Sequence, residues 1–118
     1  MSKAAVVILA DTDTKEALGR VVNGLQVVKE FKEAGDEAIA VFDGAGTRWV
    51  PKLADKGHKY HELFASVQDE IAGACEYCAE AFGVTDEVKR TGVEFLGDFE
   101  GHPSIRELIN SGYQVLTF

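Results

Sequence analysis

The feature that most constrains the fold is a short apolar run near the start of the chain, followed directly by a long amphipathic segment. The apolar run is Lys3–Ala10, and valine and isoleucine are prominent in it. Such a run is typical of a strand buried on both faces, which occurs in parallel sheets covered by helices. The next segment, 14–34, repeats apolar residues at spacings of three and four. It therefore predicts a helix whose single apolar stripe packs on that sheet.

The alternation of strand and helix continues to the end of the chain. Further strands are predicted at 37–42, 71–75, 93–96 and 113–118, and further helices at 47–56, 60–68, 76–82, 86–91 and after an opening at 102–104. Segment 63–78 also keeps helical spacing, so one long helix is the alternative to a strand and a helix that meet near residue 75. We interpret residues 1–118 as a single α/β domain built on a parallel sheet.

Charge and composition narrow the classes of partner. The chain has 12 basic and 20 acidic residues, a net charge of −8. This balance disfavours nucleic acid and anionic membranes, because both are bound through lysine and arginine. No apolar run approaches the roughly 20 residues that a membrane helix needs. The run Lys3–Ala10 ends at charged residues without a small-residue cleavage pattern, so we interpret it as a strand and expect a cytoplasmic protein.

Both cysteines of the chain, Cys75 and Cys78, lie in one segment rich in small residues. In a reducing compartment this CxxC spacing is more often catalytic or metal-binding than a structural disulfide. If a helix begins near Glu76, its positive end should lower the pKa of Cys75 and favour the reactive thiolate. Cys78 then lies about one turn later on the same face, as a resolving thiol behind an attacking one. The alternative is that both cysteines are small buried packing residues.

Two loops hold candidate contacts for an anion or another small ligand. One loop has glycines ahead of a helix, where backbone N–H groups can hold an anion. The other follows the first strand, at the end of the sheet where doubly wound folds bind ligands. Neither loop is a P-loop or a dinucleotide fingerprint, and a tight turn or a helix cap is the alternative interpretation of each. The candidate residues are Asp11, Thr12, Gly44, Gly46 and Thr47.

Histidines raise the question of a metal site. His58, His61 and His102, together with the two cysteines, would supply enough ligands for zinc. No second CxxC and no HExxH pattern accompanies them, so we interpret the histidines as solvent-exposed or helix-end residues. We expect no metal site and no cofactor.

Several stretches of the chain resemble the DsrE/DsrF-like family of sulfur-relay proteins, and in particular its small stand-alone members. They are Val41–Gly46, the central segment Gly73–Gly83, Glu100–Ser104 and Gly112–Phe118. The resemblance implies a three-layer α/β/α fold with a five-stranded parallel sheet and a homo-oligomer, either a trimer or a hexamer. It also implies that the cysteine just after the third strand carries sulfur as a persulfide.

In this chain Cys75 occupies that position. Cys78 departs from the relay subunits, which do not generally keep a second cysteine three residues on. We expect a sulfur carrier or sulfurtransferase-like protein in which Cys78 resolves or protects the persulfide, with another protein or a small thiol as donor or acceptor. The alternatives are a dithiol–disulfide redox protein, and a non-catalytic binding or assembly module with packed cysteines. No nucleic acid and no membrane are expected among its partners.

Overall fold

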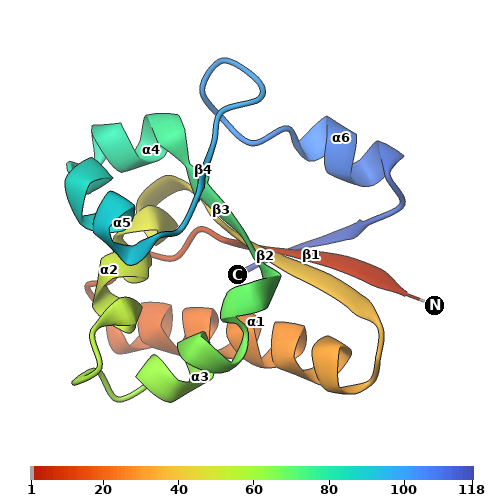
Figure 1. Cartoon of the computed structure of the whole chain (residues 1–118), viewed down its shortest axis with the longest axis horizontal. Helices are drawn as coiled ribbons and strands as arrows, with labels where there is room; N and C mark the ends of the chain where they lie inside the picture. The colour runs from red at the N-terminus through yellow and green to blue at the C-terminus, as the bar shows by residue number, and fades with distance from the viewer. Residues whose placement is uncertain (1) are drawn as a thin grey trace.

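Five parallel strands form the central sheet of the computed structural model, which describes residues 2–118 (Figure 1). The strand order is β4-β3-β2-β1-β5, so β4 and β5 are the edges. Every neighbouring pair is parallel, as the run buried on both faces predicted. The strands are β1 (Lys3–Ile8), β2 (Glu37–Phe42), β3 (Ile71–Cys75), β4 (Phe95–Leu96) and β5 (Gln114–Thr117).

Helices cover both faces of this sheet, which makes the predicted three-layer α/β/α fold. Figure 1 shows α1 and α3 below the sheet and α4 and α6 above it. No helix within residues 2–118 combines the length and the apolar character needed to span a membrane. The helical segments are α1 (Lys15–Glu33), the 3-10 helix η1 (Gly44–Arg48), α2 (Trp49–Ala54), α3 (His61–Ser66), the 3-10 helix η2 (Gln68–Glu70), α4 (Glu76–Ala81), α5 (Thr85–Thr91) and α6 (Ile105–Asn110).

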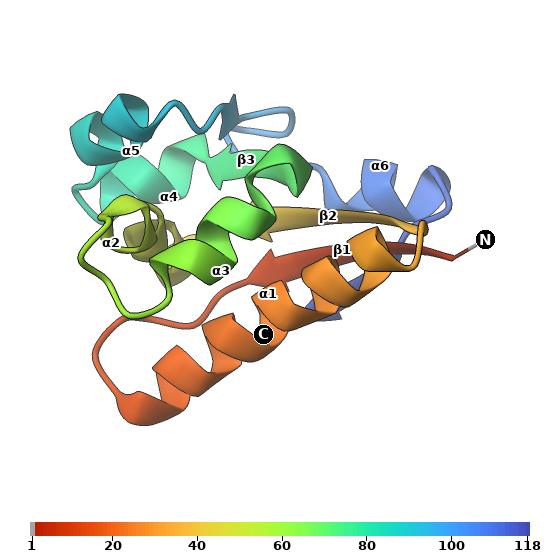
Figure 2. The same cartoon turned by 60° about the horizontal axis from the view of Figure 1, so that its bottom comes forward.

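Helix α1 packs closely along β1 and β2 (Figure 2). Its apolar stripe buries Val21, Leu25 and Val28, each worth about 1.5–3 kcal/mol relative to an exposed side chain. Gly24 lies on the same face, and a Cβ there would come within 2.5 Å of Ile8 Cδ1. The glycine therefore lets the helix approach the sheet, which offsets its low helix propensity.

Capping groups explain where two of the helices begin, and some strands are shorter than predicted. Helix α1 begins at Lys15 because the Thr14 hydroxyl accepts the N–H of Ala17 at 3.0 Å. The helix expected at 47–56 begins earlier, as η1, because the Asp43 carboxylate accepts the N–H of Gly44 at 2.9 Å. The strand expected at 93–96 is shorter and contains only the two residues of β4. Strand β1 ends at Ile8, two residues before the end of the predicted run, and the other three strands lie within one residue of the predicted ranges or on them.

Tyr113, just before β5, makes a hydrogen bond that ties this edge of the sheet to β2. Its hydroxyl donates to the Glu37 carboxylate, and Lys3 Nζ lies 4.4 Å from the centre of its ring. The hydrogen bond to Glu37 and partial burial raise the pKa of Tyr113 to about 12. The folded protein therefore holds this proton more tightly than the unfolded chain. This contribution to stability is lost as the pH rises from about 10 to about 12.

We predict that Glu37→Gln lowers the pKa of Tyr113 toward its ordinary value of about 10. Glutamine removes the negative charge that disfavours the tyrosinate. The measurement is the ultraviolet absorbance of tyrosinate against pH, taken as the difference between each protein and its Tyr113→Phe counterpart. Identical difference titrations for the wild type and Glu37→Gln would contradict this account of the edge.

Candidate functional site

The strand β3 ends at Cys75 and helix α4 begins at Glu76, which confirms the predicted break and excludes one long helix. Cys75 is itself the N-cap of α4. Its Sγ accepts the N–H of Cys78 at 3.3 Å. Gly73 makes the end of β3 possible, because a Cβ there would lie 2.6 Å from the carbonyl oxygen of Glu94 beside β4. The local chain thus holds the first sulfur at the carboxyl end of the sheet and the second sulfur one turn into the helix.

Four side chains converge at this point: Asp43, Cys75, Cys78 and His102. One ligand-type atom from each lies within 4.8 Å of those of the other three. His102 Nδ1 is 3.4 Å from Cys75 Sγ and 3.9 Å from Cys78 Sγ. The thiol of Cys78 donates to Asp43 Oδ1 at 3.5 Å. Asp43 follows β2, Cys75 ends β3 and His102 follows β4, so three adjacent strands deliver the cluster to one edge of the sheet.

A tight hairpin places His102 over the sulfurs. Phe99 and His102 exchange two backbone hydrogen bonds of 2.9 Å and 2.8 Å. The two residues between them, Glu100 and Gly101, have φ values of 51° and 85°, as the central residues of a type I′ turn require. The Gly101 carbonyl accepts the N–H of Tyr77 at 2.9 Å. The centre of the Tyr77 ring lies 4.7 Å from the centre of the His102 ring. These contacts join the hairpin to α4.

Burial controls the electrostatics of Cys75, which is fully inaccessible to solvent. The pKa of Cys75 is raised to about 12, first by burial, then by its hydrogen bond with Cys78, and further by the negative charge of Asp43. The expected lowering of this pKa at the helix start is therefore wrong. The single N–H of Cys78 that points at the sulfur favours the thiolate, but it does not outweigh the loss of hydration. Conversion of this thiol to the thiolate requires a nearby base, and His102 Nδ1 lies within reach.

The five residues predicted to contact an anion or small ligand have partners within the protein. Asp11 Oδ1 accepts from Arg48 Nη1 and from the N–H of Thr12, both at 2.7 Å. The buried Thr47 hydroxyl donates to the carbonyl of Gly44 at 2.9 Å. These contacts account for the residues as parts of the fold, and a role for them in ligand binding stays a prediction.

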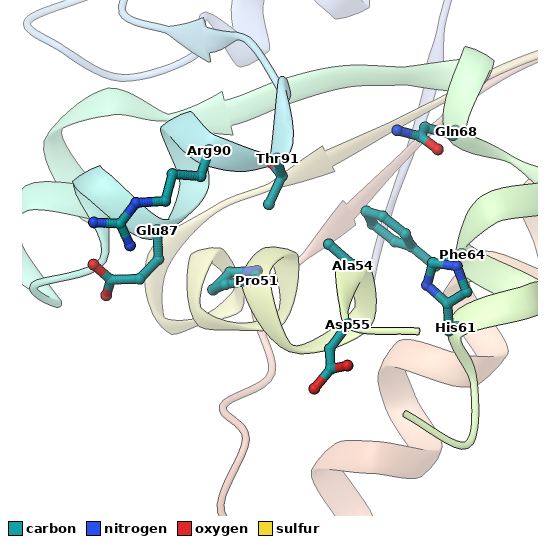
Figure 3. A pocket seen from close by; sticks show the side chains of 9 residues that line it. All are labelled: Pro51, Ala54, Asp55, His61, Phe64, Gln68, Glu87, Arg90 and Thr91. Atoms are coloured by element: carbon teal, nitrogen blue, oxygen red, sulfur yellow. The ribbon is translucent and has the colours of Figure 1, made fainter. Parts of the chain in front are cut away.

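Of the three histidines, His102 alone belongs to the cysteine cluster within residues 2–118. His58 Nδ1 accepts the N–H of Tyr60 at 3.0 Å, and His61 Nδ1 donates to the carbonyl of Leu53 at 2.7 Å. His61 instead lines a cavity of about 490 Å³ between α2, α3 and α5, seen in Figure 3. Its wall also includes Pro51, Ala54, Asp55, Phe64, Gln68, Glu87, Arg90 and Thr91, and neither cysteine.

Comparison with known proteins identifies the family of the chain. The family model described as DsrE/DsrF-like matches residues 5–118. The chain belongs to the DsrE/DsrF-like family. It is 29% identical over 96 residues to the uncharacterized protein MJ0733 of Methanocaldococcus jannaschii, a match that covers 81% of this chain and 78% of that protein. The resemblance seen in the sequence is thereby confirmed.

A solved structure supports the fold. The conserved protein of unknown function BT1422 from Bacteroides thetaiotaomicron superposes with a TM-score of 0.58 at 20% sequence identity. The match covers 97% of this chain and 94% of that protein. At this identity it bears on the fold alone. The sulfur-relay association of the DsrE/DsrF-like family is compatible with the close Cys75–Cys78 pair.

Sequence reasoning missed Asp43 as a member of the cluster, and it named His102 only among the ligands of a zinc site that it did not favour. It interpreted the loop that begins at Asp43 as a turn or anion site, and His102 as the opening of the last helix. The available signal was that Asp43 directly follows a predicted strand, Cys75 ends another, and His102 comes after the loop that follows a third. That signal becomes specific only once β2, β3 and β4 are known to be neighbours.

Proposed function

We propose that this protein is a sulfur carrier that holds sulfane sulfur as a persulfide on Cys75, with Cys78 as the resolving or protecting thiol. The observation that carries the proposal is the approach of both sulfurs to one imidazole nitrogen, at 3.4 Å and 3.9 Å. A base placed between two thiols can take the proton of whichever sulfur attacks. Membership of the DsrE/DsrF-like family supports the assignment to sulfur chemistry.

In the loading step, His102 Nδ1 takes the thiol proton of Cys75. The thiolate then attacks the terminal sulfur of a donor persulfide or polysulfide. A sulfur–sulfur bond forms on Cys75, the donor's sulfur–sulfur bond breaks, and the remainder of the donor leaves as a thiolate or a shorter polysulfide with the electron pair. No outside oxidant is needed, because the donor sulfur already carries the required oxidation state.

Release has two routes that differ in the sulfur attacked. A thiolate of an acceptor attacks the terminal sulfur, takes it as a new persulfide and leaves Cys75 as a thiolate. Alternatively, the thiolate of Cys78 attacks Cys75 Sγ, which forms the Cys75–Cys78 disulfide and expels the terminal sulfur as hydrosulfide. The second route is geometrically available because the two Sγ atoms lie within 4.8 Å of each other. It makes Cys78 a resolving thiol and requires a reductant of the thiol class to restore the pair.

The test is intact-protein and peptide mass spectrometry after reduced protein is incubated with inorganic polysulfide in the presence of EDTA. The expected result is a gain of one sulfur on Cys75, which persists longer in Cys78→Ser and disappears in Cys75→Ser. Loss of two hydrogens without added sulfur would instead favour a dithiol–disulfide redox protein. Two free, slowly alkylated thiols without an adduct would overturn both reactive functions and favour packed cysteines.

The partners of the carrier also remain proposals. We infer a protein or small-thiol donor and acceptor and a cytoplasmic setting, and the family resemblance predicts a trimer or hexamer. Two aromatic side chains beside the cluster are well exposed, Tyr77 at 57% and Phe99 at 64%. A cavity of about 590 Å³ also lies alongside the hairpin, lined by Phe99 and the segment 103–107. These features support access to a partner at this end of the molecule.

A further inference from the structure

We propose that Asp43, Cys75, Cys78 and His102 together form a tetrahedral binding site for a thiophilic divalent cation, with Zn²⁺ as the best fit. This inference goes beyond the proposed sulfur chemistry and does not rest on it. It departs from the expectation drawn from the sequence, which considered His102 and the cysteines as zinc ligands but predicted no metal site, and which did not place Asp43 beside them.

The distances between the side-chain atoms match those of a zinc site. With zinc about 2.3 Å from sulfur and about 2.0–2.1 Å from nitrogen or oxygen, tetrahedral geometry separates a sulfur from a nitrogen or oxygen by about 3.5 Å. The observed separations are 3.4 Å and 3.9 Å from His102 Nδ1 to the two sulfurs, and 3.5 Å from Cys78 Sγ to Asp43 Oδ1. All four atoms lie within 4.8 Å of one another, so one ion can contact all of them.

The donor set is chemically suited to zinc. Two thiolates, one imidazole and one carboxylate are all zinc ligands, and zinc binding displaces the thiol protons. The two thiolates and the carboxylate carry three negative charges, which a divalent cation reduces to one. Calcium and magnesium are disfavoured, because both prefer sites made of oxygen alone.

Neighbouring groups orient the proposed ligands. Asp43 is held by the N–H of Gly44 at 2.9 Å, and Cys75 Sγ accepts the N–H of Cys78 at 3.3 Å. The ring of Tyr77 packs beside that of His102, with 4.7 Å between the ring centres. Support of this kind fixes ligand geometry and contributes to metal affinity. Four protein ligands fill the coordination shell of zinc, so the site has the ligand number of a closed structural centre.

Zinc and sulfur would then compete for the same cysteines. A zinc-bound thiolate cannot attack a sulfur donor without leaving the metal, and a persulfide or disulfide on Cys75 alters or removes a ligand. We therefore expect zinc to hold the cysteines in reduced, unreactive form until the ion is withdrawn.

The test uses freshly reduced, full-length protein without any sulfur donor. Zn²⁺ is titrated in competition with a chromophoric chelator, and Co²⁺ is used as an optical probe. The wild type should bind one equivalent of Zn²⁺, and its Co²⁺ form should show the intense visible band of a tetrahedral site and sulfur-to-cobalt charge transfer. Loss of a supporting group typically costs 10–100-fold in affinity, so we expect Asp43→Asn and His102→Ala, which remove ligands, each to cost about 100-fold or more. Asparagine can still accept the N–H of Gly44, so Asp43→Asn keeps the helix cap.

The matched control is His58→Ala/His61→Ala, which removes the other two histidines and should leave Zn²⁺ affinity unchanged. Cys75→Ser/Cys78→Ser should abolish binding, with circular dichroism to show that each variant is folded. Failure of the reduced wild type to bind Zn²⁺ overturns the proposal, as does affinity that is unaffected by both Asp43→Asn and His102→Ala. Because the sulfur-loading assay contains EDTA, zinc binding without loading overturns only the proposed carrier function, and loading without zinc binding overturns only the metal site.

Discussion

Replacing His102 with glutamine is expected to slow the loading of sulfur onto Cys75 by about 100-fold or more. A positioned general base typically contributes 10²–10⁴-fold to the rate of a proton-coupled step. His102 Nδ1 lies 3.4 Å from Cys75 Sγ, and the fully buried sulfur faces the carboxylate of Asp43 instead of water. Glutamine keeps a hydrogen-bonding side chain of similar reach but does not take up the proton.

The measurement is the initial rate at which Cys75 gains one sulfur from inorganic polysulfide, followed by mass spectrometry with EDTA present. His58→Gln is the matched control, because His58 lies outside the cluster and should load at the rate of the wild type. A rate for His102→Gln within about threefold of the wild type would remove His102 from the chemistry. Wild-type stability of the variant, measured by thermal unfolding, separates loss of the base from loss of the hairpin.

Much of the fold can be predicted from patterns within short segments of the sequence. The run Lys3–Ala10 predicted a strand buried on both faces, and Ala4 to Ile8 are each no more than 2% exposed. The break at Cys75 was a choice between two periodicities, and Gly73, which lets β3 approach the chain beside β4, provides a physical reason for the strand. The order of the strands is set by packing between distant segments, which no local pattern encodes.

In the candidate site, too, local features could be predicted from the sequence and contacts between distant segments could not. The cysteine pair was visible because its members are three residues apart and one turn of helix keeps them together. Asp43 is 35 residues from Cys78, and His102 is 24 residues from it, so their approach depends on the positions of β2 and β4 beside β3. The hairpin that orients His102 also requires a positive φ at Glu100. Glutamate rarely adopts a positive φ, so the sequence does not predict a turn there.

The position of Cys75 at a helix start was predicted correctly, but the expected lowering of its pKa was wrong. The sulfur stands at a helix start, as predicted, but α4 contains only six residues. Burial removes the water that would stabilise a thiolate, and Asp43 adds a repelling charge. Both effects depend on tertiary neighbours. In these surroundings, Cys75 becomes a thiolate only with a base or a metal ion beside it. His102 can act as that base or as a ligand of that metal ion.

Gly46→Ala is expected to destabilise the protein by about 3 kcal/mol or more, at the upper end of the usual cost of overpacking. A Cβ at Gly46 would lie 2.0 Å from the carbonyl oxygen of Ile8 and 2.7 Å from its carbonyl carbon. These are backbone atoms of a strand that pairs on both sides, so they cannot move aside as a flexible side chain would. The same carbonyl oxygen accepts the N–H of Asp43 at 2.9 Å, so the clash acts on the bond that anchors Asp43.

Gly19→Ala is the matched control, since it adds the same methyl group where no other atom lies within 4 Å. It stands within α1, where alanine is favoured over glycine by about 1 kcal/mol, so it should raise the melting temperature by a few degrees. Gly46→Ala should lower the melting temperature by about 10 °C or more, as measured by calorimetry. A loss below about 1 kcal/mol, by the same measure, would show that η1 can move away from β1. The position of Asp43 beside the cysteines would then be adjustable, whereas a large loss means that the close contact of η1 with β1 fixes it there.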